Sequence, residues 1–377
     1  MSRLLFLALV VLSSLLSLFL TYTPQGRAGF HAVLFVLQVL EVPIQPQSWF
    51  TNEPVRREVT YPQAGNTGVA DIYRIPDDRE RAAVLLFLGA NAAGREDEDV
   101  VNLGNALARA GFVVMFHWSP TMALQYNIDP SEIDNLVWAF QYLREREFVD
   151  RNRVGMGGFC VGASFSLVAA ADSRIRDDVK FINAFGPYFD ARDLLLQVVS
   201  RSRHYQGKRE PWDPDRLTRK VLANELIETL VDPGEREVMS RLYLERQDVR
   251  QSEQEGLSDS ALRVRRLLDG TTPQEAQNLY GELPADFRES MDRISPSTYV
   301  DSLKARLMIL HDRDDNLVPA AESRRLAGAM EQRGDFRYTE VLAFEHVRPT
   351  SGGGLWGLAK EGLKLSRHMY GILREAD

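Results

Sequence analysis

Short apolar runs alternate with amphipathic segments along two stretches of the chain, at about 55–190 and 295–375. A continuous apolar run is typical of a strand buried on both faces of a parallel sheet, and apolar residues three and four apart are typical of a covering helix. The alternation therefore predicts an α/β fold with a mostly parallel sheet flanked by helices, opened by an antiparallel hairpin. The predicted strands are residues 55–61, 68–75, 82–88, 112–116, 153–157, 180–185, 306–311 and 336–344, and the predicted helices include 100–110, 319–334 and 355–373.

Between residues 191 and 294 this alternation stops, and charged segments with helical spacing replace the strands. The clearest of them are residues 217–230, 235–244 and 258–268. We interpret the region 191–294 as a helical cap inserted into the α/β core. The core is then predicted in two parts, at 46–190 and 295–377.

The N-terminal region differs in character from the rest of the chain. Residues 4–20 are almost all Leu, Phe, Val and Ala, and no small-residue cleavage site follows them. This favours a single uncleaved membrane span over a cleaved secretion signal. A second apolar run, at residues 30–42, contains Gln38 and Glu41 and predicts an interfacial or re-entrant helix. We therefore expect residues 1–45 to anchor the protein in a membrane, with the side of the soluble part open and secretion as the alternative.

Composition narrows the classes of partner. The chain has 377 residues, 44% of them hydrophobic and 26% charged, with a net charge of −8. The net negative charge argues against a nucleic-acid partner, because phosphate binding needs a basic surface. None of the six histidines stands at metal-ligand spacing from Cys or carboxylate residues, so we expect neither a metal nor a cofactor. The oligomeric state is not indicated.

The run Gly158-Phe159-Cys160-Val161-Gly162 lies between an apolar strand segment and a helical segment of small residues. A strand, a glycine-flanked turn and a helix are the setting that presents a nucleophile above an α/β sheet. Cys160 is the only cysteine, so it cannot form an internal disulfide. A lone cysteine is also often a small buried hydrophobic residue, and that alternative stays open.

A thiol needs a base to become a nucleophile, and a histidine base needs a carboxylate to orient it. The order nucleophile, acid, histidine suits this kind of sheet. Asp315 follows the predicted strand 306–311, and His346 follows the last predicted strand. Because parallel strands end at one edge of the sheet, all three residues are expected at the edge that carries Cys160.

These segments resemble the α/β-hydrolase fold, and within it the dienelactone hydrolase-like group, which has a cysteine in the same turn. The run from Asp315 to Val318-Pro319 is similar to the acid loop of that family, and His346 matches its late histidine. The resemblance implies a catalytic triad of Cys160, Asp315 and His346. It covers the two core parts and leaves out the N-terminal region and the cap.

The loop after the third predicted strand departs from the family pattern. It reads Leu88-Gly89-Ala90-Asn91, where many relatives have His-Gly. Backbone N–H groups of Val161 and Ala90 still suit an oxyanion hole, and Asn91 is either a further donor or a residue that shapes the turn. The acidic residue that dienelactone hydrolases carry just before this loop is absent from Leu86 to Leu88, which argues against dienelactone as the substrate.

Other residues compete for these roles. Either Asp312 or Asp314 would be the acid if the loop were shifted, although the spacing to Val318-Pro319 favours Asp315. His311 lies inside the strand end and suits a structural role. His117 ends another strand and suits packing or pocket lining. Ser164, one helical turn after Cys160, is expected to pack within its helix.

The sequence thus predicts a hydrolase that cleaves a small carboxylic ester, lactone or thioester through a thioacyl intermediate. Two alternatives remain at this level. One is a non-catalytic binding or scaffold protein with the same fold. The other is an acyltransferase that uses the same triad, if the cap excludes water.

Overall fold

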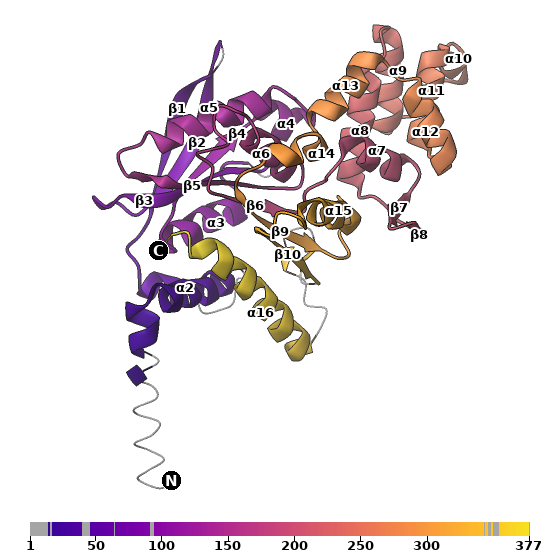
Figure 1. Cartoon of the computed structure of the whole chain (residues 1–377). Coiled ribbons are helices and arrows are strands. Elements are labelled where there is room, and N and C mark those ends of the chain that lie inside the picture. Colours follow the sequence, from indigo (N-terminus) through magenta and orange to yellow (C-terminus); the bar gives the residue numbers. More distant parts are fainter. Residues whose placement is uncertain are drawn as a thin grey trace.

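An eight-stranded sheet forms the centre of the molecule (Figure 1). The computed structural model describes residues 14–15, 17–39, 46–63, 65–90, 94–342, 344–345, 348–349 and 354–376. The strand order is β1-β2-β4-β3-β5-β6-β9-β10. These strands are β1 (Val55–Gln63), β2 (Asn66–Arg74), β3 (Arg81–Phe87), β4 (Val113–Trp118), β5 (Val149–Phe159), β6 (Phe181–Phe185), β9 (Arg306–Asp312) and β10 (Phe336–Val341).

The direction of the strands agrees with the apolar pattern of the sequence. β1 and β2 pair as an antiparallel hairpin, and β2 is antiparallel to β4. All pairs from β4 to β10 are parallel, so their carboxyl ends meet at one edge of the sheet. The predicted fold class, an α/β-hydrolase fold with a mostly parallel sheet flanked by helices, is therefore confirmed.

Helices cover both faces of the sheet because the central strands are apolar on both sides. In β3, Ala83, Leu85 and Phe87 belong to one buried cluster, and the alternate residues 82, 84 and 86 belong to the other. The first cluster includes residues of α5 (Glu132–Arg144), α6 (Val161–Ala170) and α15 (Ala320–Met330). The second includes residues of α2 (Pro24–Val39), α3 (Glu98–Arg109) and α16 (Gly354–Leu373).

The segment between β6 and β9 forms the helical cap, drawn at the upper right of Figure 1. Its helices are α7 (Ala191–Val199), α8 (Arg216–Glu228), α9 (Pro233–Tyr243), α10 (Gln251–Glu255), α11 (Asp259–Asp269), α12 (Pro273–Gly281) and α13 (Ala285–Arg293). The cap also holds a hairpin of β7 (Ser202–Tyr205) and β8 (Lys208–Pro211), whereas the sequence predicts no strand there. All of β8 is exposed, so its strand has no apolar alternation that would mark it.

Short elements connect these layers. They are α4 (Pro120–Gln125), α14 (Pro296–Tyr299), two 3-10 helices (Pro46–Trp49 and Val300–Ser302), and the strands β11 (Phe344–Glu345) and β12 (Arg348–Pro349).

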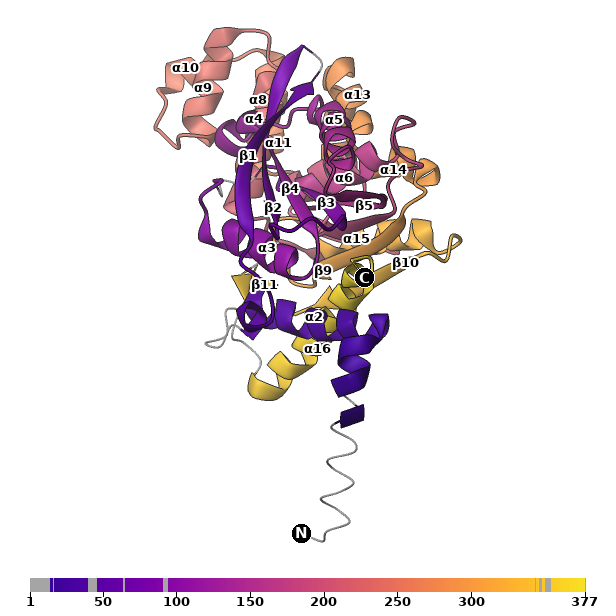
Figure 2. The same ribbon diagram turned by 90° about the vertical axis from the view of Figure 1, so that its left-hand side faces the viewer.

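Residues 30–39 of the second apolar run belong to α2, which is docked on the protein, and residues 40–42 lie outside the described residues. Ala32, Phe35 and Val36 are buried in the cluster that α2 shares with α3 and α16. Figure 2 shows α2 crossing α16 below the sheet, and Gln38 donates to Asn102 at 2.7 Å. The predicted interfacial or re-entrant helix is therefore wrong, since protein covers the apolar face of this segment.

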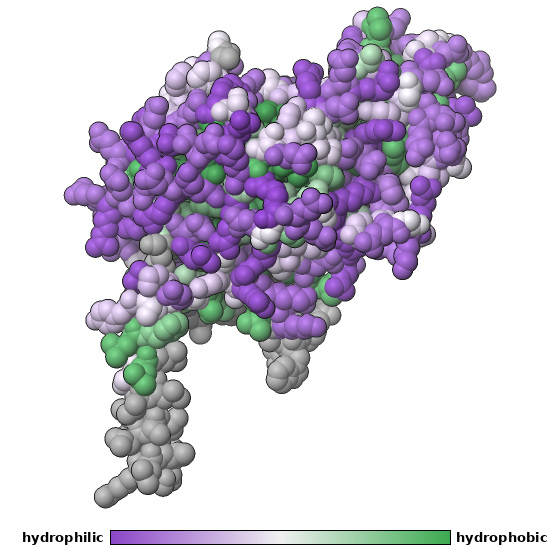
Figure 3. All heavy atoms as spheres, in the orientation of Figure 1, coloured by the Kyte–Doolittle hydropathy of each residue, from purple (hydrophilic) through white to green (hydrophobic). Residues whose placement is uncertain are grey.

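The predicted transmembrane anchor is also corrected. Across the part of the chain that the structure describes, no helix combines the length and apolar character that a membrane crossing requires. This finding overturns the predicted span and the membrane-anchored localisation, and it leaves the membrane partner that rested on them without support. Residues 4–13 and 16 of the predicted span lie outside the described residues. Exposed large hydrophobic side chains, including Leu18, Phe19 and Tyr22, precede α2. Figure 3 shows a group of hydrophobic atoms at the lower left of an otherwise mostly hydrophilic face.

Candidate active site

Cys160 occupies a sharp turn between β5 and α6. Its φ of 52° and ψ of −124° lie in a region that residues with a side chain rarely adopt. Such a backbone costs on the order of 1–3 kcal/mol and persists where the surroundings fix it. Here the Cys160 N–H donates to the Phe185 carbonyl at 2.8 Å, which ties the turn to the end of β6.

The two flanking glycines allow the turn to pack against β3 and its following loop. A Cβ on Gly162 would lie 2.2 Å from the Phe87 carbonyl oxygen, and one on Gly158 would lie 2.5 Å from the Gly162 carbonyl. Gly89, with φ of +68°, closes the contact from the other side, since its own Cβ would lie 2.5 Å from the Gly162 nitrogen. In each case the atom that the added Cβ would meet belongs to the backbone, which cannot move aside as a flexible side chain could. These positions therefore require glycine.

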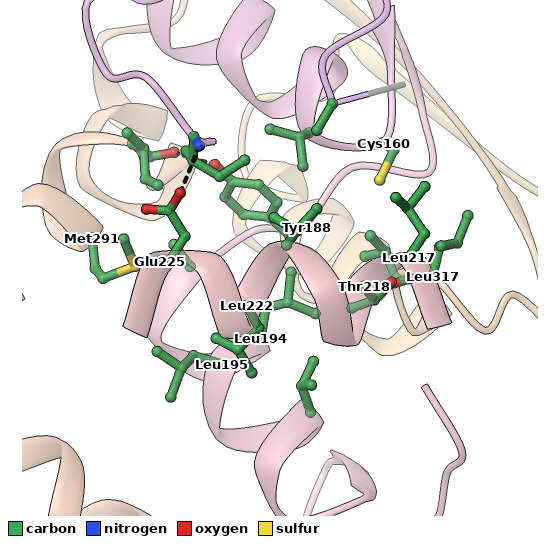
Figure 4. Close-up of a pocket in the computed structure, with 18 of the residues that line it drawn as sticks. Cys160, Tyr188, Leu194, Leu195, Leu217, Thr218, Leu222, Glu225, Met291 and Leu317 are labelled. Atoms are coloured by element: carbon green, nitrogen blue, oxygen red, sulfur yellow. Dashed lines mark hydrogen bonds between the residues drawn. The ribbon is translucent and has the colours of Figure 1, made fainter. Parts of the chain in front are cut away.

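The turn opens into an apolar cavity of about 100 Å³ beneath the cap (Figure 4). Cys160, Val161 and Ala90 all line it, so the proposed nucleophile and both proposed oxyanion donors share one space. The cap and the loop after β9 supply most of the remaining wall. The other lining residues are Ile128, Tyr188, Ala191, Leu194, Leu195, Val198, Leu217, Thr218, Val221, Leu222, Glu225, Phe287, Met291, Ile294, Leu317 and Val318.

Asp315 lies in the loop after β9, beside this cavity. Its Oδ1 accepts the N–H groups of Leu317 at 2.7 Å and Val318 at 3.1 Å. The Trp212 indole donates to the Asp315 carbonyl oxygen at 3.2 Å. The carboxylate is buried and held at the edge of the sheet where β5 also ends. Backbone geometry thus fixes this acid, in the way that an Asx turn fixes its side chain.

Burial beneath the cap, and then the Asp315 carboxylate, raise the pKa of the Cys160 thiol to about 12, while the Val161 N–H lowers it. Both raising effects disfavour the thiolate, the first by desolvation and the second by like charge. The thiol is therefore protonated at neutral pH. A nucleophilic role needs a neighbouring base that removes the proton during attack.

Asp315→Asn is expected to lower the pKa of Cys160, because the variant removes the negative charge that opposes the thiolate. Alkylation by iodoacetamide at neutral pH should then become faster, by about tenfold for one unit of pKa shift. Ester turnover should fall in the same variant. For the wild type, the alkylation rate should keep rising with pH up to about 12.

Asp314→Asn is the matched control, because Asp314 is an exposed neighbour in the same loop. It should leave both the alkylation rate and turnover near the wild-type values. If Asp314→Asn or Asp312→Asn lowered turnover and Asp315→Asn did not, Asp315 would not be the acid.

His346 and Asn91 lie outside the described residues. The structure therefore brings together Cys160, Val161, Ala90 and the neighbouring Asp315. The histidine of the triad stays a prediction from sequence.

His311 packs against the loop that contains Asp315 and Val318. It is fully buried, and its Nε2 lies 2.9 Å from the Val318 carbonyl and 3.6 Å from Asp315 Oδ2. The Ser323 hydroxyl is 2.6 Å from its Nδ1. Burial lowers the pKa of His311, so the imidazole is neutral, with Nε2–H donating to Val318 and Nδ1 accepting from Ser323. This geometry suits a structural role.

His117 and Ser164 also take packing positions. His117 is buried between Tyr61, whose hydroxyl lies 2.5 Å from Nδ1, and Glu132, whose carboxylate lies 2.7 Å from Nε2. Ser164 is fully buried and donates to the Tyr188 carbonyl at 2.9 Å. Neither is among the described residues that line the cavity.

Glu225 is a lining residue that the sequence analysis did not single out. It comes from α8, and Figure 4 shows its carboxyl bonded to a backbone N–H across the cavity from Cys160. The available signal was spacing, because Leu217, Val221 and Glu225 follow one another at intervals of four on one face of the helix. Among the described residues, no group of three or more His, Cys, Asp or Glu could hold a metal ion.

No protein-family model matches the chain, and no curated protein sequence matches it. Among solved structures, acylaminoacyl peptidase of Pyrococcus horikoshii is similar, with a TM-score of 0.49 and 13% identity over 85% of this chain and 41% of the peptidase. An esterase of Pyrobaculum calidifontis has a TM-score of 0.46 and 14% identity over 97% of both chains. A thermostable carboxylesterase from a metagenomic library has a TM-score of 0.48 and 14% identity over 94% of this chain and 98% of the carboxylesterase. This chain thus spans about two fifths of the peptidase's length.

Proposed function

We propose that the protein is a hydrolase that cleaves carboxylic esters, lactones or thioesters through a thioacyl intermediate on Cys160. The observation that supports this most is the position of Cys160, in a left-handed turn that opens into an apolar cavity. A strained backbone at a cavity is a feature of functional sites. A buried structural cysteine would need neither the strained turn nor the two tightly packed glycines.

In the proposed reaction, His346 removes the Cys160 proton as the sulfur attacks the carbonyl carbon of the substrate. The N–H groups of Val161 and Ala90 stabilise the oxyanion. The bond from the carbonyl carbon to the leaving group then breaks, and His346 returns the proton to the leaving oxygen or sulfur. Water next attacks the thioacyl carbon as His346 removes one of its protons, the S–C bond breaks, and His346 returns that proton to the Cys160 sulfur. The carboxylic acid is released and the thiol is regenerated.

A dienelactone hydrolase-like specificity is the finer form of this proposal, and its support is the sequence resemblance around Cys160, Asp315 and His346. The end of β3 and the residue that follows it, Leu86 to Leu88, supply no carboxylate near the thiol. The cavity lining is also almost entirely apolar. We therefore propose an ester or thioester with an apolar acyl group as the substrate class.

The test is to trap the intermediate. Wild-type protein mixed with p-nitrophenyl acetate is expected to give a burst of p-nitrophenolate equal to about one equivalent of enzyme, as for other covalent mechanisms. Mass spectrometry of acid-quenched samples should locate one acetyl group on the peptide that carries Cys160. Turnover without any adduct on Cys160 would overturn the proposed nucleophile. Absence of both turnover and adduct would favour the non-catalytic alternative.

A further inference from the structure

Among the described residues that line the cavity, Glu225 carries a carboxylate. The other side chains are apolar or carry a hydroxyl group, apart from the Cys160 thiol. The Ile128 N–H donates to one of its oxygens at 2.6 Å. The second oxygen makes no hydrogen bond with the residues that the structure describes. No Lys, Arg or His is among the described lining residues, so no cation neutralises the group from within the cavity.

The other polar side chains of the cavity are already engaged. The Tyr188 hydroxyl donates to the Ile294 carbonyl at 2.9 Å, and the Thr218 hydroxyl donates to the Leu317 carbonyl, also at 2.9 Å. Their donor groups are therefore not available to Glu225 or to a ligand. Both hydroxyl oxygens can still accept a hydrogen bond, so Glu225 differs from the other described lining residues in supplying a carboxyl acceptor.

Glu225 lies at the opposite end of the cavity from the thiol. In Figure 4, Cys160 is on the side of Leu217 and Leu317, and Glu225 is on the side of Met291. Leu217 and Glu225 are eight residues apart on α8, which corresponds to about 12 Å along the helix. A group that reaches Glu225 is thus the far end of a chain whose carbonyl is at Cys160.

A carboxyl group in this position is costly unless something satisfies it. Burial raises the pKa of Glu225 to about 7, with smaller contributions in the same direction from Glu228 and Asp129, while the Ile128 N–H lowers it. A hydroxyl at the end of a ligand would satisfy the second oxygen in either protonation state, because it donates to the carboxylate and accepts from the carboxylic acid. An ammonium group would donate to the carboxylate. A methyl group at this point would exclude water from that oxygen without giving it a partner, which is the expensive arrangement.

We propose that Glu225 makes the cavity select esters or thioesters whose apolar acyl chain ends in a hydrogen-bond donor, either a hydroxyl or an amino group. This inference rests on the proposed function, because Cys160 is taken to hold the other end of the substrate. The apolar lining between the two ends accommodates the methylene chain, and Glu225 recognises its terminus. Sites that satisfy a buried polar group discriminate strongly against ligands that lack the matching group.

The experiment compares kcat/KM for p-nitrophenyl octanoate, ω-hydroxyoctanoate and ω-aminooctanoate, each divided by the value for the acetate ester in the same variant. The wild type should prefer the hydroxy ester to the plain octanoate by about tenfold, the value of one hydrogen bond to a buried carboxyl. Glu225→Leu should abolish that preference. Glu225→Gln keeps a carbonyl acceptor, so it should keep the hydroxy preference and lose most of any amino preference.

Glu228→Gln is the matched control, because Glu228 is exposed on the same helix and does not line the cavity. Its ratio of hydroxy ester to plain octanoate should equal that of the wild type. An unchanged ratio in Glu225→Leu would overturn the proposal even if all esters were cleaved.

A binding measurement separates this proposal from the proposed function. Octanamide and ω-hydroxyoctanamide are not cleaved, and their Kd values for full-length Cys160→Ala protein can be measured by calorimetry. Tighter binding of the hydroxy amide, lost when Glu225→Leu is added, would support the proposal even if the wild type failed to turn over any ester. Equal Kd values for the two amides would overturn it.

Discussion

Cys160→Ala is expected to lower kcat/KM for p-nitrophenyl esters by about 10³-fold or more, since loss of a nucleophile removes the whole covalent route. The fold should stay intact, because an alanine side chain needs no more space than the thiol that it replaces and the turn is held from outside by the Phe185 carbonyl. Steady-state kinetics and far-UV circular dichroism on the same samples would measure both effects. We regard this variant as the decisive test of the site.

The control for that variant is Ser164→Ala, one helical turn further along α6. Ser164 is the nearby hydroxyl that would be the alternative nucleophile, yet it is fully buried and donates to the Tyr188 carbonyl. Its replacement should cost about 1 kcal/mol of stability and leave most turnover in place. If the two variants exchanged these results, Ser164 and not Cys160 would be the reacting group.

Gly162→Ala is expected to destabilise the protein by about 3 kcal/mol, as for severe overpacking in a close-packed interior. The added Cβ would lie 2.2 Å from the Phe87 carbonyl and 2.7 Å from the Gly89 nitrogen. Relief would require β3 and the turn to separate, which would also move Cys160 away from the Ala90 side of the cavity. We expect a lower urea-unfolding midpoint together with a loss of ester turnover.

Gly328→Ala is the control for this variant, and it is expected to raise the stability of the protein in the same urea-unfolding assay. Gly328 lies inside α15, is exposed, and has no atom within 4 Å of the position of an added Cβ. Alanine there should stabilise the helix by up to about 1 kcal/mol and leave turnover unchanged. A similar response of the two glycines would mean that packing at the turn does not constrain position 162.

The sequence was sufficient for features that depend on neighbouring residues. Apolar runs identified the central strands β3, β4, β6 and β9, because a strand covered on both faces must be apolar almost throughout. The spacing of Gly158 and Gly162 around Cys160 was also readable, since each glycine is required within the same strand-turn-helix segment. The choice of Asp315 among three neighbouring acids used its spacing to Val318-Pro319, and its role as the acid stays a prediction. In the structure, Asp315 Oδ1 accepts two N–H groups of its own loop.

Other features depended on segments far apart in the chain, and the sequence analysis failed there. The apolar face of a helix must be covered by other apolar groups. The sequence of the helix does not indicate whether lipid or another part of the protein covers it. For Phe35 and Val36 the partners are residues of α3 and α16, which follow much later. Hence the membrane interpretation of this run was wrong. The sequence analysis also missed the hairpin of β7 and β8, because the exposed residues of β8 show no alternation of apolar and polar positions.

The composition of the cavity was likewise decided by tertiary structure. Glu225 stands in a charged helix, where the sequence suggests a solvated side chain. Its surroundings come from α7, α13 and the segment that contains Ile128, which only the folded chain brings to that face of α8. The sequence by itself determined the sheet, the turn and the nucleophile that we propose. Tertiary structure decided what covers α2 and which polar group faces the substrate, because burial is a property of contacts between distant segments.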